Sequence, residues 1–244
     1  ATSNKYVSGI TLTDGTGTAS NYALPSLGSY SAGVNSVTIT AATLTPTLTN
    51  TGVTKVYDAT TSAPAGFTPS YSFTGLVSGD TAATLSSTGS AYNNANVVGA
   101  TTVTVSGLSI TGITGSKSSA TTDYVLDATS KTVSGSITPK SVTLSATKVY
   151  DGTTGLTGYV TIGSTVGGQT LGYTGSTSSD AHVASSNKYV SGITLTDGTG
   201  TATNYALPSL AAYSAGVNSV TINAATLTPT LTNTGVTKVY DATT

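Results

Sequence analysis

A short string that brings a lysine, a tyrosine and an aspartate together occurs three times in the chain. It reads Lys-Val-Tyr-Asp, then Gly or Ala, then two Thr, and it starts at Lys55, Lys148 and Lys238. A lysine beside a carboxylate could form a covalent isopeptide crosslink. That reaction needs a second buried acid, and without Glu only an Asp could serve.

The same string also fits a strand that ends in a turn. There the aspartate accepts hydrogen bonds from the backbone and hydroxyl groups of the next three residues. We therefore interpret the string as a structural turn with a buried or half-buried tyrosine, and we expect Tyr57 and Tyr150 to occupy equivalent, mostly buried positions. The residues of this predicted motif are Lys55, Tyr57, Asp58, Lys148, Tyr150, Asp151, Lys238, Tyr240 and Asp241.

Aspartates in glycine-rich turns are candidates for calcium binding. Ca²⁺ needs six to eight oxygen ligands with several carboxylates converging. Asp14, Asp80 and Asp197 each stand alone in their turns, and no Asp-x-Asp occurs. We interpret them as turn formers and expect neither a metal nor a cofactor.

Catalytic chemistry has little support in this sequence. His182 is the only histidine, and without Cys or Glu it has no partners for a zinc site or a catalytic triad. No Gly-x-Ser-x-Gly nucleophile motif occurs, and the paired carboxylates of a glycoside hydrolase are missing. We expect that the protein is not an enzyme.

The chain has fourteen tyrosines, and exposed ones could form platforms on which sugar rings stack. This keeps a repeated carbohydrate-binding module open as the alternative function. The candidate ligand-facing residues are Tyr22, Tyr30, Tyr205 and Tyr213.

The charge content excludes two classes of partner. The chain has eight Lys and nine acidic residues with no Arg, for a net charge of -1. Binding to nucleic acid or to an anionic membrane surface requires clustered cations, so we expect neither, nor insertion into a membrane. The absence of Cys leaves folding to packing and hydrogen bonds, and it favours export.

Internal repeats dominate the sequence. Residues 1–61 return as 184–244 with five differences, which is typical of a tandem array. The Lys-Val-Tyr-Asp strings are 93 and 90 residues apart, which indicates a second, more diverged repeat inside the first. We expect the chain to start and stop inside modules of a longer array. The predicted parts are the C-terminal part of a module at 1–42, complete modules at 43–140 and 141–225, and the N-terminal part of a module at 226–244.

Alternating apolar and hydroxyl residues predict half-buried strands, as in a two-layer β-sandwich. The pairs expected to share an apolar face are Val103 with Val105, Val142 with Leu144, Ile10 with Leu12, and Val37 with Ile39. Short joints near Pro139 and Ala225 leave no flexible linker. We therefore predict an all-β chain of tandem immunoglobulin-like β-sandwich modules stacked end to end as an elongated rod.

The chain resembles the YDG-type repeat domains of large bacterial surface adhesins, including filamentous-haemagglutinin-like proteins. The resemblance rests on the string at Lys148, on Val105-Ser106-Gly107-Leu108 and on Asn204-Tyr205-Ala206-Leu207. Two departures are visible: Ala59 and Ala242 replace the motif glycine, and Asp123 stands before Tyr124 where Asn is usual.

The resemblance implies a secreted, Gram-negative, β-rich stalk or adhesive repeat on the cell surface or in a biofilm matrix. Its expected partners are neighbouring repeats of the same chain, host or matrix glycans, and further copies of itself.

Overall fold

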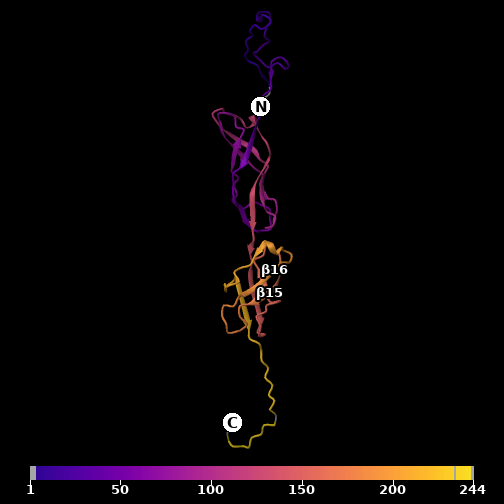
Figure 1. Ribbon diagram of the computed structural model, residues 1–244, viewed down its shortest axis with the longest axis vertical. Coiled ribbons are helices and arrows are strands. Elements are labelled where there is room, and N and C mark those ends of the chain that lie inside the picture. The colour runs from indigo at the N-terminus through magenta and orange to yellow at the C-terminus, as the bar shows by residue number, and fades with distance from the viewer. Residues whose placement is uncertain (1–3, 234, 243–244) are drawn as a thin grey trace. The chain divides into compact units, whose positions relative to one another are not determined.

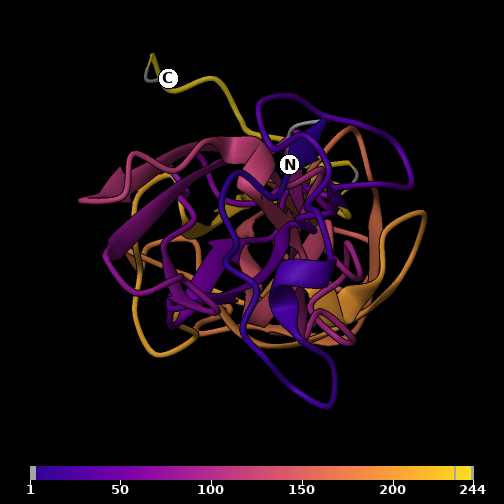
Figure 2. The same ribbon diagram turned by 90° about the horizontal axis from the view of Figure 1, so that it is seen from above.

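The computed structural model describes residues 4–233 and 235–242 and divides into two compact units. Unit 1 holds the residues up to Lys55 together with Thr60–Ile137, and unit 2 holds Val56–Ala59 together with the residues from Thr138 onward. The described residues contain strands and three single-turn 3-10 helices but no α-helix (Figures 1 and 2). The predicted all-β class is confirmed.

Unit 1 is built from three main sheets with strand orders β10-β3-β5, β4-β11-β8-β7 and β6-β9, and a small pair β1-β2. The elements are β1 (Lys5–Tyr6), η1 (Ala19–Asn21), β2 (Ser36–Val37), β3 (Ala42–Leu48), β4 (Val53–Val56), β5 (Tyr71–Thr74), β6 (Asp80–Ser86), β7 (Gly89–Tyr92), β8 (Thr102–Ser106), β9 (Ser109–Gly115), η2 (Thr121–Asp123), β10 (Tyr124–Leu126) and β11 (Ser130–Thr138).

Unit 2 has the sheets β14-β13-β18, β15-β16 and β12-β17, and β15 and β16 lie side by side in Figure 1. Its elements are β12 (Lys140–Ser141), β13 (Thr143–Val149), β14 (Val160–Gly163), β15 (Leu171–Ser178), β16 (Val190–Asp197), η3 (Ala202–Asn204), β17 (Tyr205–Ala206) and β18 (Asn218–Asn223).

The core of each unit follows the predicted alternation. Val103 and Val105 on β8 are fully buried, while the threonines between and beside them are partly exposed. Val142 and Leu144 are buried in the same way in unit 2. One face of each strand thus packs inward and the other meets water, as period-two patterning requires.

Each unit contains strand pairs that correspond to pairs in the other unit. Tyr124 on β10 lies opposite Ala42 in a parallel pair, and Tyr205 on β17 lies opposite Lys140 in another. Each tyrosine directly follows a 3-10 turn. Long antiparallel pairs, β6 with β9 and β15 with β16, complete the correspondence. Equivalence over the whole of 43–140 and 141–225 stays a prediction.

The two near-identical copies differ in structure. Ile193 is 8% exposed in β16, but its counterpart Ile10 is 54% exposed and lies in no strand. Tyr205 is 5% exposed, whereas Tyr22 is 69% exposed. Figure 1 shows the indigo segment before residue 40 as mostly irregular chain.

The predicted strand at Ile10 and Leu12 is therefore wrong for the first copy, and the one at Val37 and Ile39 shrinks to two residues. The reason is the absence of pairing partners. The second copy pairs with β13 and β15, and in the described part of unit 1 no such strands pair with residues 7–14.

We expect Ile193→Ala to lower the free energy of unfolding of unit 2 by about 2–5 kcal/mol, since it opens a cavity in a packed sheet. The matched variant Ile10→Ala should change stability by less than about 0.5 kcal/mol, because that side chain is already in water. Urea unfolding of both variants measures this. Equal losses would contradict the structural difference between the copies.

Candidate functional site

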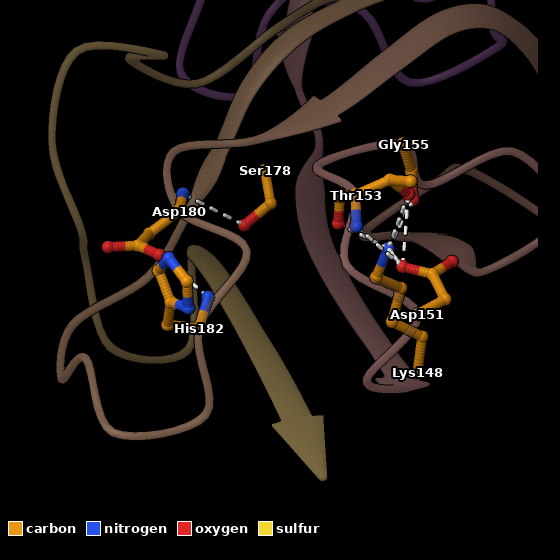
Figure 3. Close-up of polar contacts among 7 residues, drawn as sticks. All are labelled: Lys148, Asp151, Thr153, Gly155, Ser178, Asp180 and His182. Atoms are coloured by element: carbon orange, nitrogen blue, oxygen red, sulfur yellow. Dashed lines mark hydrogen bonds and ion pairs between the residues drawn. The ribbon is translucent and has the colours of Figure 1, made fainter. Parts of the chain in front are cut away.

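The Lys148 turn is the best-defined polar site in unit 2. Its side chain, delivered by β13, is fully buried. The ammonium donates to the carboxylate Oδ1 of Asp151 at 2.7 Å and to the carbonyl oxygens of Thr153 at 2.7 Å and Gly155 at 2.9 Å (Figure 3). A buried ammonium is tolerated because three oxygens replace its water shell.

Asp151 also accepts hydrogen bonds from the residues that follow it in the turn. Its Oδ1 accepts hydrogen bonds from the backbone N–H of Thr153 at 2.9 Å and from the Thr153 hydroxyl at 3.0 Å, which is the bonding predicted from the sequence. The hydrogen bond from Lys148, followed by that from the Thr153 backbone, lowers the pKa of Asp151 from 3.8 to about 2. The carboxylate thus stays charged beside the ammonium down to acid pH.

The residue after the aspartate adopts a left-handed backbone in all three strings. Its φ is 80° at Gly152, 64° at Ala59 and 59° at Ala242. Glycine reaches this region freely, whereas alanine meets steric strain there. The turn shape is therefore retained where the motif glycine is replaced.

The lysine contacts vary between the strings. Lys55 donates to the Thr60 carbonyl at 2.8 Å and its hydroxyl at 2.9 Å, and it lies 5.5 Å from the centre of the Tyr92 ring. Lys238 lies 2.9 Å from Asp241, with both side chains about half exposed. A lysine bound by its own turn is common to the three.

The expectation that Tyr57 and Tyr150 are both mostly buried is wrong for Tyr150. Tyr57 is 4% exposed, because its ring packs edge-on against Tyr205 with centroids 5.4 Å apart and its hydroxyl bonds Gln169. Tyr150 is 38% exposed and stacks on His182 alone among the described rings. Removing the Tyr150 ring should therefore leave no deep cavity.

Unit 2 contains a second cluster, here called the tyrosine clamp, which sequence reasoning missed. The Tyr205 hydroxyl accepts from the backbone N–H of Val166 at 3.0 Å and donates to Gln169 Oε1 at 2.7 Å. Tyr205 was expected to face a ligand, and this expectation is wrong, since the clamp buries the residue. Tyr22, Tyr30 and Tyr213 are exposed as expected.

Unit 1 has its own tyrosine clamp with the same geometry. The Tyr124 hydroxyl accepts from the backbone N–H of Val77 at 2.9 Å and donates to Asp80 Oδ2 at 2.5 Å. The hydrogen bond to Asp80 raises the pKa of Tyr124. The sequence signal was present: Val-x-Gly followed by Asp80 or Gln169 recurs, 44 and 36 residues before a tyrosine that follows a polar residue.

The turn around His182 is held by Asp180 (Figure 3). Asp180 accepts from the His182 backbone N–H and from the Ser185 hydroxyl, both at 2.7 Å, and these bonds lower its pKa. Lys188, a buried lysine that sequence reasoning missed, donates to the carbonyl oxygens of Val183 and Ser185. These hydrogen bonds hold the loop of residues 180–188 together.

The glycine-turn aspartates bind backbone. Asp14 Oδ1 accepts from the Ala19 N–H at 2.6 Å, and Asp197 Oδ1 accepts from the Ala202 N–H at 2.7 Å. Within residues 4–233 and 235–242, three or more potential metal ligands do not come together anywhere. None of the helices in that part of the chain is long and apolar enough to cross a membrane.

Part of the chain matches a known domain family. Residues 40–132 match the YDG domain. The YDG match contains the Lys55 string and the Tyr124 clamp, and it overlaps the predicted module at 43–140. Comparisons with curated proteins and with solved structures found no match.

We expect Lys148→Ala to destabilise unit 2 by about 1–3 kcal/mol, because it leaves the carbonyl oxygens of Thr153 and Gly155 without their donor. Lys238→Ala is the matched control and should cost less than about 0.5 kcal/mol, since its ion pair is exposed. Thermal and urea unfolding of the two variants give the comparison. A small effect at Lys148 would show that water replaces the ammonium.

Because the folded state favours the charged Asp151 carboxylate, we expect unit 2 to lose stability at acid pH. Its pKa is lower in the folded chain than in the unfolded one, so the folded state binds fewer protons. The stabilisation is therefore complete above about pH 4 and is lost as the pH falls towards about 2. Urea midpoints for unit 2 at pH 5, 3 and 2 should fall. In Asp151→Asn this part of the fall should disappear, and an unchanged pH profile would contradict the assignment.

Proposed function

We propose that this chain is a structural and adhesive tandem repeat of an exported bacterial surface protein or extracellular fibre, with no enzymatic activity. The observation that carries the proposal is the repetition itself: a 61-residue segment recurs with five differences, and the two units share their pairings and tyrosine clamps. The YDG match supports it, since such repeats are what the sequence resembles.

The mechanical argument rests on independent small cores. Each unit has its own buried strands. Loss of one core would leave the next intact, which suits a chain that bears load in series. Hydroxyl-rich outer faces keep the chain hydrated at a net charge of only -1.

The finer shape is part of the proposal. We infer immunoglobulin-like sandwiches stacked end to end as a rod. Only Pro139 separates β11 from β12, so the joint holds no flexible spacer. The proposed location is the cell surface or the biofilm matrix of a Gram-negative bacterium. The proposed partners are neighbouring repeats, further copies and matrix or host glycans, without nucleic acid.

Solution scattering tests the stalk. We expect a chain in which residues 43–225 are repeated three times to lengthen in proportion to module number, by roughly 30–45 Å per module. Chelation of calcium should leave the length unchanged, because Asp14 and Asp197 already bind backbone. A maximum dimension that stays nearly constant as modules are added would overturn the rod, and shortening on chelation would overturn its independence of calcium.

A repeated carbohydrate-binding module is the second candidate, and one observation favours it. Tyr213 in unit 2 and its counterpart Tyr30 are both 40% exposed, although Tyr22 and Tyr205 differ in burial between the same two copies. Exposed rings offer stacking surfaces for sugars. Glycan binding that is lost in Tyr213→Ala would favour this function over the stalk.

A further inference from the structure

Residues 4–39 present apolar side chains that their near-identical counterparts bury. Ile10, Tyr22 and Ile39 are exposed, whereas Ile193, Tyr205 and Ile222 are buried. The sequence is almost the same, since only three of the five differences fall within 4–39, at residues 20, 28 and 29. The difference in burial must therefore come from what covers each copy.

In unit 2 the segment 140–183 packs over these side chains. Its strand β13 pairs in parallel with β18, β15 pairs antiparallel with β16, and β12 pairs with β17. Each partner strand has a counterpart in residues 7–40, with the same side chains at the paired positions except Thr40 in place of Asn223. A segment like 140–183 thus finds almost the same surface on residues 4–39.

A pocket of about 230 Å³ adjoins that surface in unit 1. It is lined by Thr40, Ala42, Val77 and Tyr124 together with Ile39, Ser119 and Asp123. Strand pairing and sequence relate these positions to unit 2: Thr40 corresponds to Thr138, Ala42 to Lys140, Val77 to Val166 and Tyr124 to Tyr205.

In unit 2 the corresponding place is filled by Tyr57. Its backbone N–H donates to the Thr138 carbonyl at 2.9 Å, its ring packs on Tyr205, and Gln169 Nε2 donates to its hydroxyl at 3.1 Å. In unit 1, Asp80 stands at the Gln169 position. Its Oδ1 is buried and has no partner among the described residues, so an incoming hydroxyl could satisfy it by donating a hydrogen bond.

We propose that residues 4–39 and the pocket beside Tyr124 form one docking surface for a β segment with the sequence of residues 140–183. The tyrosine of that segment's Lys-Val-Tyr-Asp turn, the equivalent of Tyr150, fills the pocket, packs against Tyr124 and donates to Asp80.

Backbone geometry connects the two parts of this surface. The Tyr150 N–H donates to the Asn223 carbonyl at 2.8 Å, just beyond the β13–β18 pair. Asn223 is the repeat counterpart of Thr40, which lines the pocket. A segment that pairs with residues 36–40 as β13 pairs with β18 therefore delivers its tyrosine to the pocket. The inference needs only these contacts and does not depend on the stalk role.

The probe is a synthetic polypeptide of residues 140–183, titrated into the ¹⁵N-labelled full chain. We expect saturable amide shifts in residues 5–39, with new protection from hydrogen exchange there, and shifts at Val77 and Tyr124. Saturable binding without any of these shifts would overturn the surface, as would the absence of binding. Shifts confined to residues 187–222 would also overturn it, because they would show exchange with the segment already in place.

Two variant probes test the pocket separately. A Tyr150→Ala probe should still shift residues 5–39, should bind about tenfold more weakly and should leave Val77 and Tyr124 unshifted. A Tyr150→Phe probe should restore the shifts at Tyr124 but keep part of the loss in affinity, since only the hydroxyl is missing. Unchanged shifts at Val77 and Tyr124 with the Ala probe would show that the tyrosine does not enter the pocket.

Discussion

Pairing between the first and last strands of a repeat is the constraint on which the remaining structure depends. In unit 2, β13 and β18 are about seventy residues apart in sequence and form six consecutive parallel register pairs. With that pairing Val220 and Ile222 are buried; without it their copies Val37 and Ile39 lie in water. The apolar pattern alone does not form the strand, because an unpaired strand leaves its backbone groups unsatisfied and buries little surface.

Local contacts persist where this pairing is missing. Asn35 is buried in the first copy and Asn218 in the second, and each holds a neighbouring loop through its side-chain amide. The 3-10 turns before Tyr22 and Tyr205 are likewise present in both. These features need partners only a few residues away and form in either setting. The sheets need partners far along the chain.

The sequence predicted what depends on local pattern. The all-β class, the buried faces at Val103 and Leu144 and the Asp151 turn follow from alternation and turn chemistry. Tyrosine burial could not be predicted in this way. Tyr57 and Tyr150 share a motif but differ in surroundings, and Tyr205 is buried by a hydrogen bond to Gln169, 36 residues earlier. The buried Lys188 was missed because its acceptors are backbone carbonyls, which no side-chain pattern reveals.

The near-identity of the two copies has a consequence for folding. Residues 4–39 and 187–222 offer almost the same edge to the single segment 140–183. The upstream copy is synthesised first and is available before the downstream one exists. The downstream copy has the entropic advantage of a short loop, although each doubling of loop length costs only about 0.6 kcal/mol. In a nascent chain of such repeats the segment 140–183 can therefore pair with either copy, one available earlier and the other nearer along the chain, and mispairing between modules is a route to misfolding.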